Sequence, residues 1–150
     1  MKEIRALVRR LTAKYETASP FEMCDLLHID VYRSDLPACV RGLCFQTESG
    51  HSIILLNREM EERERRYCCA HELGHALLHP GLNAQTMADL TDLCVPKLER
   101  EADCFAACLL IDPFVDEWRE SYEMLTLDQI ADLAGLPQKA VELWHEVAAK

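Results

Sequence analysis

The chain has 150 residues, of which 49% are hydrophobic and 28% charged, a length and composition that suit one globular domain, residues 1–150. Its net charge of −10 argues against a broad surface for nucleic acid or anionic membrane. No apolar run approaches the roughly 18–20 residues that span a bilayer, and the first residues mix both charges, unlike a signal peptide. We therefore expect a cytoplasmic protein with no membrane partner.

Eight cysteines would indicate disulfide bonds in a secreted protein, but a reducing cytosol favours free thiols, metal ligands or catalytic thiols. No two of them are spaced as Cys-x-x-Cys, the usual zinc-finger and thioredoxin pattern. Cys104 and Cys108 are four residues apart, share a helical face and are candidates for a metal site. The favoured interpretation is that the cysteines pack as small apolar side chains.

The first 57 residues contain two predicted helices and three predicted strands. An apolar stripe predicts a helix over 2–16, and Ser19-Pro20-Phe21-Glu22 is a capping box that begins a second, short helix. Three runs of strand-forming residues follow, at 29–35, 40–47 and 51–57. The last run, HSIILLN, indicates a strand covered on both faces or one edge in a cleft, because SIILL is apolar throughout.

The rest of the chain is predicted to be helical. A long helix begins near residue 59 with a highly charged stretch and ends at Pro80-Gly81. A second helix covers 97–111, and Pro113 closes it. A pair of helices, 126–134 and 138–148, is separated by Gly135-Leu136-Pro137.

The sequence HELGH, residues 71–75, matches the His-Glu-x-x-His pattern. Residues four apart lie on one face of a helix, so His71 and His75 can direct ring nitrogens at one zinc ion, at about 2.0–2.1 Å. Glu72 projects roughly 100° around the axis and flanks the ion without binding it. It is the candidate general base, which takes a proton from water during attack on a carbonyl and delivers it to the leaving amine.

A third ligand is expected from the next helix, because a catalytic zinc ion has three protein ligands and an open position. Glu99 is the candidate, and Asp103, four residues later, would accept a hydrogen bond from the far nitrogen of His71. Glu101 is the weaker candidate, since it points towards the side of Cys104 and Cys108. His79 lies about 12 Å along the axis from His71 and is interpreted as a helix-end residue near exposed carbonyls.

Together these segments resemble the ImmA/IrrE family of metallopeptidases. The family pairs an HEIGH-type motif with a Glu-x-x-Ala-Asn/Asp-x-Phe-Ala-Ala-x-Leu-Leu-Met-Pro segment, which is similar to EREADCFAACLLIDP here. The matching residues are Glu99, Ala102, Asp103, Phe105, Ala106, Ala107, Leu109, Leu110 and Pro113. Ile111-Asp112 departs from the family's usual methionine before proline.

The resemblance implies a compact α+β, zincin-like metallopeptidase domain, with a small three-stranded sheet packed on the active-site helix and surrounding helices. It covers about 20–145, with its core at 51–113 and the C-terminal helical pair at 126–148. Zn²⁺, or Mn²⁺, would be the cofactor. The implied substrate is a helix-turn-helix repressor of the XRE type, whose cleavage derepresses mobile-element or stress genes. An extended substrate can add to a strand beside the active-site helix, and HSIILLN is the candidate strand.

Two other functions are considered. Ala131, Gly135 and Val141 in the C-terminal pair have the spacing of a DNA-binding helix-turn-helix, but no cluster of Lys or Arg accompanies them, so a structural hairpin is favoured. The chain is alternatively a metal-binding regulator without protease activity. Glu72 favours catalysis, because a structural site does not need it.

Overall fold

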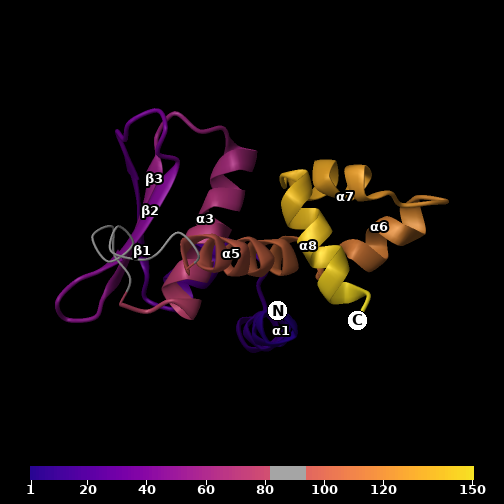
Figure 1. Ribbon diagram of the computed structural model, residues 1–150, viewed down its shortest axis with the longest axis horizontal. Coiled ribbons are helices and arrows are strands. Elements are labelled where there is room, and N and C mark those ends of the chain that lie inside the picture. Colours follow the sequence, from indigo (N-terminus) through magenta and orange to yellow (C-terminus); the bar gives the residue numbers. More distant parts are fainter. Residues whose placement is uncertain (82–93) are drawn as a thin grey trace.

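The computed structural model describes residues 1–81 and 94–150, and its elements form an α+β fold, as expected (Figure 1). In chain order the elements are α1 (Lys2–Tyr15), α2 (Pro20–Leu26), β1 (Asp30–Ser34), β2 (Gly42–Gln46), β3 (Ser52–Asn57), α3 (Glu62–Leu78), α5 (Cys94–Ile111), α6 (Val115–Ser121), α7 (Leu127–Ala134) and α8 (Gln138–Ala148). Figure 1 shows the sheet and α3 at one end, α6 to α8 at the other, and α5 between them. The short helix α6 was not predicted.

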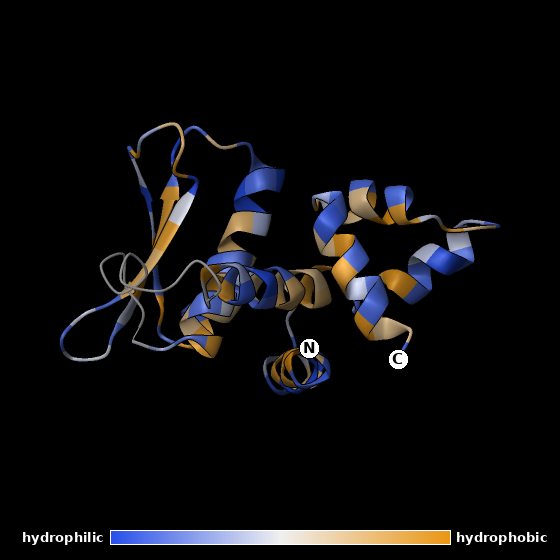
Figure 2. Ribbon diagram, in the orientation of Figure 1, coloured by the Kyte–Doolittle hydropathy of each residue, from blue (hydrophilic) through white to orange (hydrophobic). Residues whose placement is uncertain are grey.

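The strand order is β1-β3-β2, with β1 parallel and β2 antiparallel to β3. The expectation that HSIILLN forms an edge for a substrate is therefore wrong, since this segment is β3, the central strand. Its long apolar run has another cause: the strand is paired on both sides and buries Ile54 and Leu56 completely. Figure 2 shows β3 as a hydrophobic strand of the sheet.

Helix α3 packs on the sheet, and β2 approaches it closely at Gly42. A Cβ atom on this glycine would lie 2.6 Å from Sγ of Cys68 and 3.2 Å from Cγ of Glu72. Separations of that size are below van der Waals contact, so any larger residue at position 42 would force Cys68, Glu72 or the strand itself to shift. Among the described strands, β2 is paired on one side only, which leaves a free edge beside Glu72.

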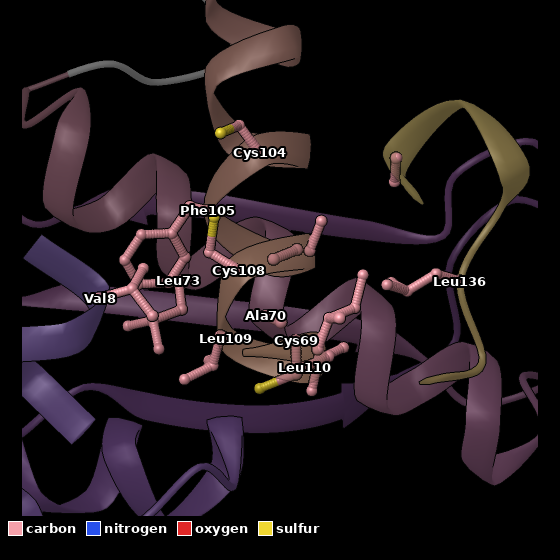
Figure 3. Close-up of a cluster of buried hydrophobic side chains, with 14 of the residues drawn as sticks. Val8, Cys69, Ala70, Leu73, Cys104, Phe105, Cys108, Leu109, Leu110 and Leu136 are labelled. Atoms are coloured by element: carbon pink, nitrogen blue, oxygen red, sulfur yellow. The ribbon is translucent and has the colours of Figure 1, made fainter. Parts of the chain in front are cut away.

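Helices α3 and α5 cross at a contact between small residues. A Cβ atom on Gly74 would lie 3.1 Å from Cβ of Phe105 and 3.2 Å from Cα of Ala102. Ala102, whose side chain is a single methyl group, permits this close approach. Around the crossing, side chains of α1, α3 and α5 gather in one buried hydrophobic cluster, in which Leu73 and Phe105 are fully buried (Figure 3).

The cysteines whose side chains are described are all free thiols. Five of these are buried, which agrees with packing as small apolar groups: Cys24, Cys68, Cys69, Cys104 and Cys108. The side chain of Cys94 lies outside the described part. None of the described helices is both long enough and apolar enough to cross a membrane.

Helices α7 and α8 form the predicted hairpin, and Gly135 between them adopts a left-handed φ of 69°. Asp112, directly after α5, joins this hairpin to the rest of the fold. Its carboxylate accepts hydrogen bonds from Nε1 of Trp144 at 2.7 Å and from Nε and Nη2 of Arg5 at 2.7 and 2.9 Å. Helix α8 also packs on α5.

Candidate metal centre

The three predicted ligands converge at one point. His71 and His75 project from α3, and their Nε2 atoms are 3.1 Å apart. Glu99, from α5, directs both carboxylate oxygens at this point: Oε2 lies 3.1 Å from Nε2 of His71, and Oε1 lies 3.1 Å from Nε2 of His75. Bonds of about 2.0–2.1 Å in tetrahedral geometry hold ligand atoms about 3.3 Å apart, so the set fits a zinc-sized ion. Within residues 1–81 and 94–150, this is the group whose donor atoms could hold a metal ion.

The electrostatics of the centre favour a cation. Burial lowers the pKa of His71, but hydrogen bonds with Asp103 and Glu99 outweigh it and raise that pKa to about 9. Hydrogen bonds from His71 and His75 hold the pKa of the Glu99 carboxyl well below its usual range. Glu99 remains 45% exposed, so the ligand set is open to solvent on one side.

Asp103 lies where the sequence predicted. Its Oδ1 is 2.9 Å from Nδ1 of His71, which leaves Nε2 of that ring for an ion. Two further contacts were missed: the phenol of Tyr67 donates to the same Oδ1, and Nζ of Lys139 lies 3.1 Å from Oδ2. Burial raises the pKa of Asp103, but the hydrogen bonds from His71 and Tyr67 overcome it and leave the pKa lowered. The carboxylate therefore stays ionised and holds the His71 ring.

Tyr67 is not among the residues predicted for the site, although its spacing from His71 is a signal that could have found it. The two residues are four apart and so share a helical face. Burial, followed by the hydrogen bond to Asp103, raises the pKa of the phenol far above its ordinary value. Tyr67 is thus a permanent donor to Asp103. Lys139 comes from α8, and no local pattern connects it to the site.

His79 ends α3 and Glu101 lies away from the candidate ligands, as interpreted from the sequence, but the contact between these two residues was not predicted. The side chain of His79 is 5% exposed, and its Nδ1 lies 3.0 Å from Nδ1 of His75. Its Nε2 is 2.8 Å from Oε2 of Glu101. At about 100° per residue, Glu99 lies to one side of Ala102 on the α5 surface and Glu101 to the other. His79, at the end of α3 and beyond the point where α3 crosses α5, contacts Glu101 on that other side.

Glu72 is buried, 8% exposed, and its Cγ would contact a Cβ atom on Gly42 of β2. Burial raises the pKa of its carboxyl, while His71 and His75 oppose the rise. Two thiols lie near it, Cys44 and Cys68, and burial followed by the Glu72 charge raises the pKa of each to about 12. Of these three groups, Glu72 is therefore the one suited to act as a general acid–base group.

Two histidines and a glutamate on one helix, with a carboxylate from the next, form the arrangement typical of metal-dependent peptidases. The chain belongs to the peptidase M78 family, whose model, described as the IrrE N-terminal-like domain, matches residues 24–145. This confirms the resemblance stated from the sequence.

Two relatives span most of the chain. Immunity region protein 2 of Bacillus phage phi105 is 36% identical over 140 residues, which is 93% of this chain and 87% of that protein. Metallopeptidase ImmA of Bacillus subtilis (strain 168) is 26% identical over 137 residues, 91% of this chain and 80% of that protein.

Proposed function

We propose that this protein is a zinc-dependent endopeptidase in which His71, His75 and Glu99 hold the ion and Glu72 is the general acid–base group. The observation that carries the proposal is the convergence of His71, His75 and Glu99, whose donor atoms all lie within 4.8 Å of one another, beside the buried carboxyl of Glu72, which is not one of them. Mn²⁺ suits the same nitrogen and oxygen donors, so it is the second candidate ion.

A metal ion held by His71, His75 and Glu99 would act as a Lewis acid, which lowers the pKa of water and polarises a peptide carbonyl. The residues of the chain do the rest. Glu72, with its raised pKa, accepts a proton from the attacking water and gives it to the leaving amine. Asp103 holds the His71 ring so that Nε2 faces the ion.

The substrate would bind as an extended strand along the free edge of β2. Unpaired backbone groups of an edge strand accept a further strand, and alternate side chains provide specificity. Gly42, at one end of β2, lies beside Glu72, so a peptide paired with β2 passes the acid–base group. This assigns to β2 the role that the sequence had suggested for 51–57.

The proposed substrate is a helix-turn-helix repressor of the XRE type, and its cleavage would derepress mobile-element or stress genes. The name of the phage relative, an immunity region protein, supports this class. Charge supports it too, since a net charge of −10 complements the basic surface that a DNA-binding protein carries. Direct binding of nucleic acid by the protein itself is not part of the proposal.

The test uses the protein reconstituted with zinc and an XRE-type repressor as the substrate. Cleavage is followed by mass spectrometry for the wild type, for Glu72→Gln, and for Glu64→Gln, an exposed control on the same helix. The Glu72→Gln variant is expected to bind zinc as the wild type does and to cleave about 10²–10⁴-fold more slowly. Zinc binding without cleavage by the wild type would instead support a non-proteolytic regulator.

A further inference from the structure

We propose that His79 and Glu101 form a relay that holds His75 in the orientation and tautomer needed to bind the ion. The inference rests on the metal centre proposed above. It concerns two residues outside the ligand set. The affinity of the centre for the metal would then depend on the carboxylate of Glu101, which reaches His75 only through the ring of His79. His79 and Glu101 are positioning residues, because they act through His75.

The chemistry of the groups fixes the direction of both hydrogen bonds. An ionised carboxylate only accepts, so Nε2–H of His79 donates to Glu101 across 2.8 Å. The other nitrogen of a neutral His79 ring is then an acceptor, and it lies 3.0 Å from Nδ1 of His75. His75 must donate from Nδ1. Its Nε2 lone pair is left facing Nε2 of His71 and the Glu99 carboxylate, where the ion would lie.

The reverse arrangement does not allow metal binding. If Nδ1 of His79 carried the proton, it would donate the hydrogen bond, and Nδ1 of His75 would have to be the acceptor. A neutral His75 would then carry its own proton on Nε2. That nitrogen would then have no lone pair for the ion. The carboxylate of Glu101 therefore selects, through His79, the tautomer of His75 that can bind a metal.

The surroundings make the relay rigid. The side chain of His79 is 5% exposed, so water does not compete for its nitrogens. Glu101 is 26% exposed, and the nearest cation to it is Nζ of Lys97, at 3.9 Å and 75% exposed. The two ligand histidines are thus held differently: His71 by a carboxylate in direct contact, and His75 by a carboxylate through a bridging ring.

Zinc affinity tests the relay without any measurement of cleavage. The dissociation constant for zinc is measured by competition with a chelating dye, and the absorption spectrum of the cobalt(II) form reports ligand geometry. The variants His79→Phe and Glu101→Ala are expected to bind zinc about 10–100-fold more weakly than the wild type. Glu101→Gln should recover part of the loss, because its amide oxygen can accept from His79. The control Lys97→Gln should bind within about twofold of the wild type.

The double variant His79→Phe/Glu101→Ala separates a relay from two independent effects. In a chain, loss of the bridging ring already disconnects the carboxylate, so the double variant should bind no more weakly than His79→Phe alone. Losses that multiply would overturn the relay. Glu101 is partly exposed, so the Glu101 variants give the answer even if His79→Phe fails to fold.

The remaining outcomes separate this inference from the proposed function. Wild-type protein that binds zinc tightly, with unchanged affinity in Glu101→Ala, overturns the relay and leaves the metal centre standing. Wild-type protein that binds neither zinc nor manganese after reconstitution overturns both.

Discussion

Gly42→Ala is the substitution that most directly probes the approach of β2 to the active-site helix. The new Cβ would lie 2.6 Å from Sγ of Cys68, 3.2 Å from the backbone oxygen of Leu55 and 3.2 Å from Cγ of Glu72. Favourable contacts lie at about 3.5–4.0 Å, so the overlap with the sulfur is about 1 Å. Cys68 is buried and cannot turn into solvent. Overpacking of this kind costs about 1–3 kcal/mol of unfolding free energy, and we expect about 2.

The sulfur atom provides the internal control. Urea unfolding of the metal-free wild type, Gly42→Ala, Cys68→Ala and the double variant gives the coupling between the two positions. Because Cys68→Ala removes the atom in closest contact, the double variant should be at least about 1 kcal/mol more stable than the sum of the single effects predicts. Leu43→Ala, which is 38% exposed on the opposite face, should show no coupling to Cys68.

Cleavage should respond differently from stability. The contact with Glu72 persists in the double variant, so its stability recovers while its activity stays low. Effects on unfolding that add within about 0.5 kcal/mol would refute the close approach of β2 to Cys68. Full activity of Gly42→Ala would refute the placement of the β2 edge beside Glu72.

Three further predictions concern the metal centre, the helix crossing and the junction at Asp112. Glu99→Gln should weaken zinc binding by more than about 100-fold, measured by dye competition. That loss exceeds the roughly 10–100-fold typical of residues that only orient a ligand, because Glu99 is itself a proposed ligand. Gly74→Ala should lower the unfolding free energy by about 1–3 kcal/mol, because its Cβ would press on Ala102. Asp112→Asn should lower it by about 2 kcal/mol at pH 7, because a charge-assisted pair with Arg5 is lost. Burial raises the pKa of Asp112, but hydrogen bonds from Arg5 and Trp144 outweigh it, so the folded pKa lies below 3.8. The stability from this carboxylate is therefore present above about pH 4 and disappears as pH falls through the folded value, so the difference between wild type and variant should shrink towards pH 2.

Each of these three predictions has an outcome that would contradict it. Equal losses of zinc affinity in Glu99→Gln and in Glu101→Gln would remove Glu99 from the ligand set. An unfolding free energy unchanged in Gly74→Ala would mean that α3 and α5 are farther apart than described. A stability difference for Asp112→Asn that is constant from pH 7 to pH 2 would show that its carboxylate does not titrate with folding.

Local spacing was enough to predict much of the fold. The three strands and the long helix are where hydrophobic runs and punctuation by proline and glycine indicate them. The order of the strands was not predictable in this way, because the apolar run of β3 suits an edge in a cleft as well as a central strand. Whether the strand is central or lies at an edge depends on its pairing with β1 and β2, and pairing is not a local property of the sequence. Helix α6 is seven residues long, too short for a reliable periodic signal.

The candidate site was also predictable only in part: spacing within one helix was informative, and contacts between helices were not. Four-residue spacing placed His71 with His75 and Glu99 with Asp103, since it is a property of one helix. Contacts that depend on how two helices cross were missed. His79 meets Glu101 only because α3 extends past its contact with α5, and Lys139 reaches Asp103 only because α8 packs on α5.

The crossing of α3 and α5 has a thermodynamic consequence. His71 and His75 come from one helix and Glu99 from the other, and the three donors are close together only when the helices cross at Gly74 and Ala102. An ion held by both helices therefore binds the folded chain and not the unfolded one. By mass action this adds about 4 kcal/mol of stability when free metal exceeds the dissociation constant 1,000-fold. The amount of folded protein in a cell would then follow the supply of metal as well as the sequence.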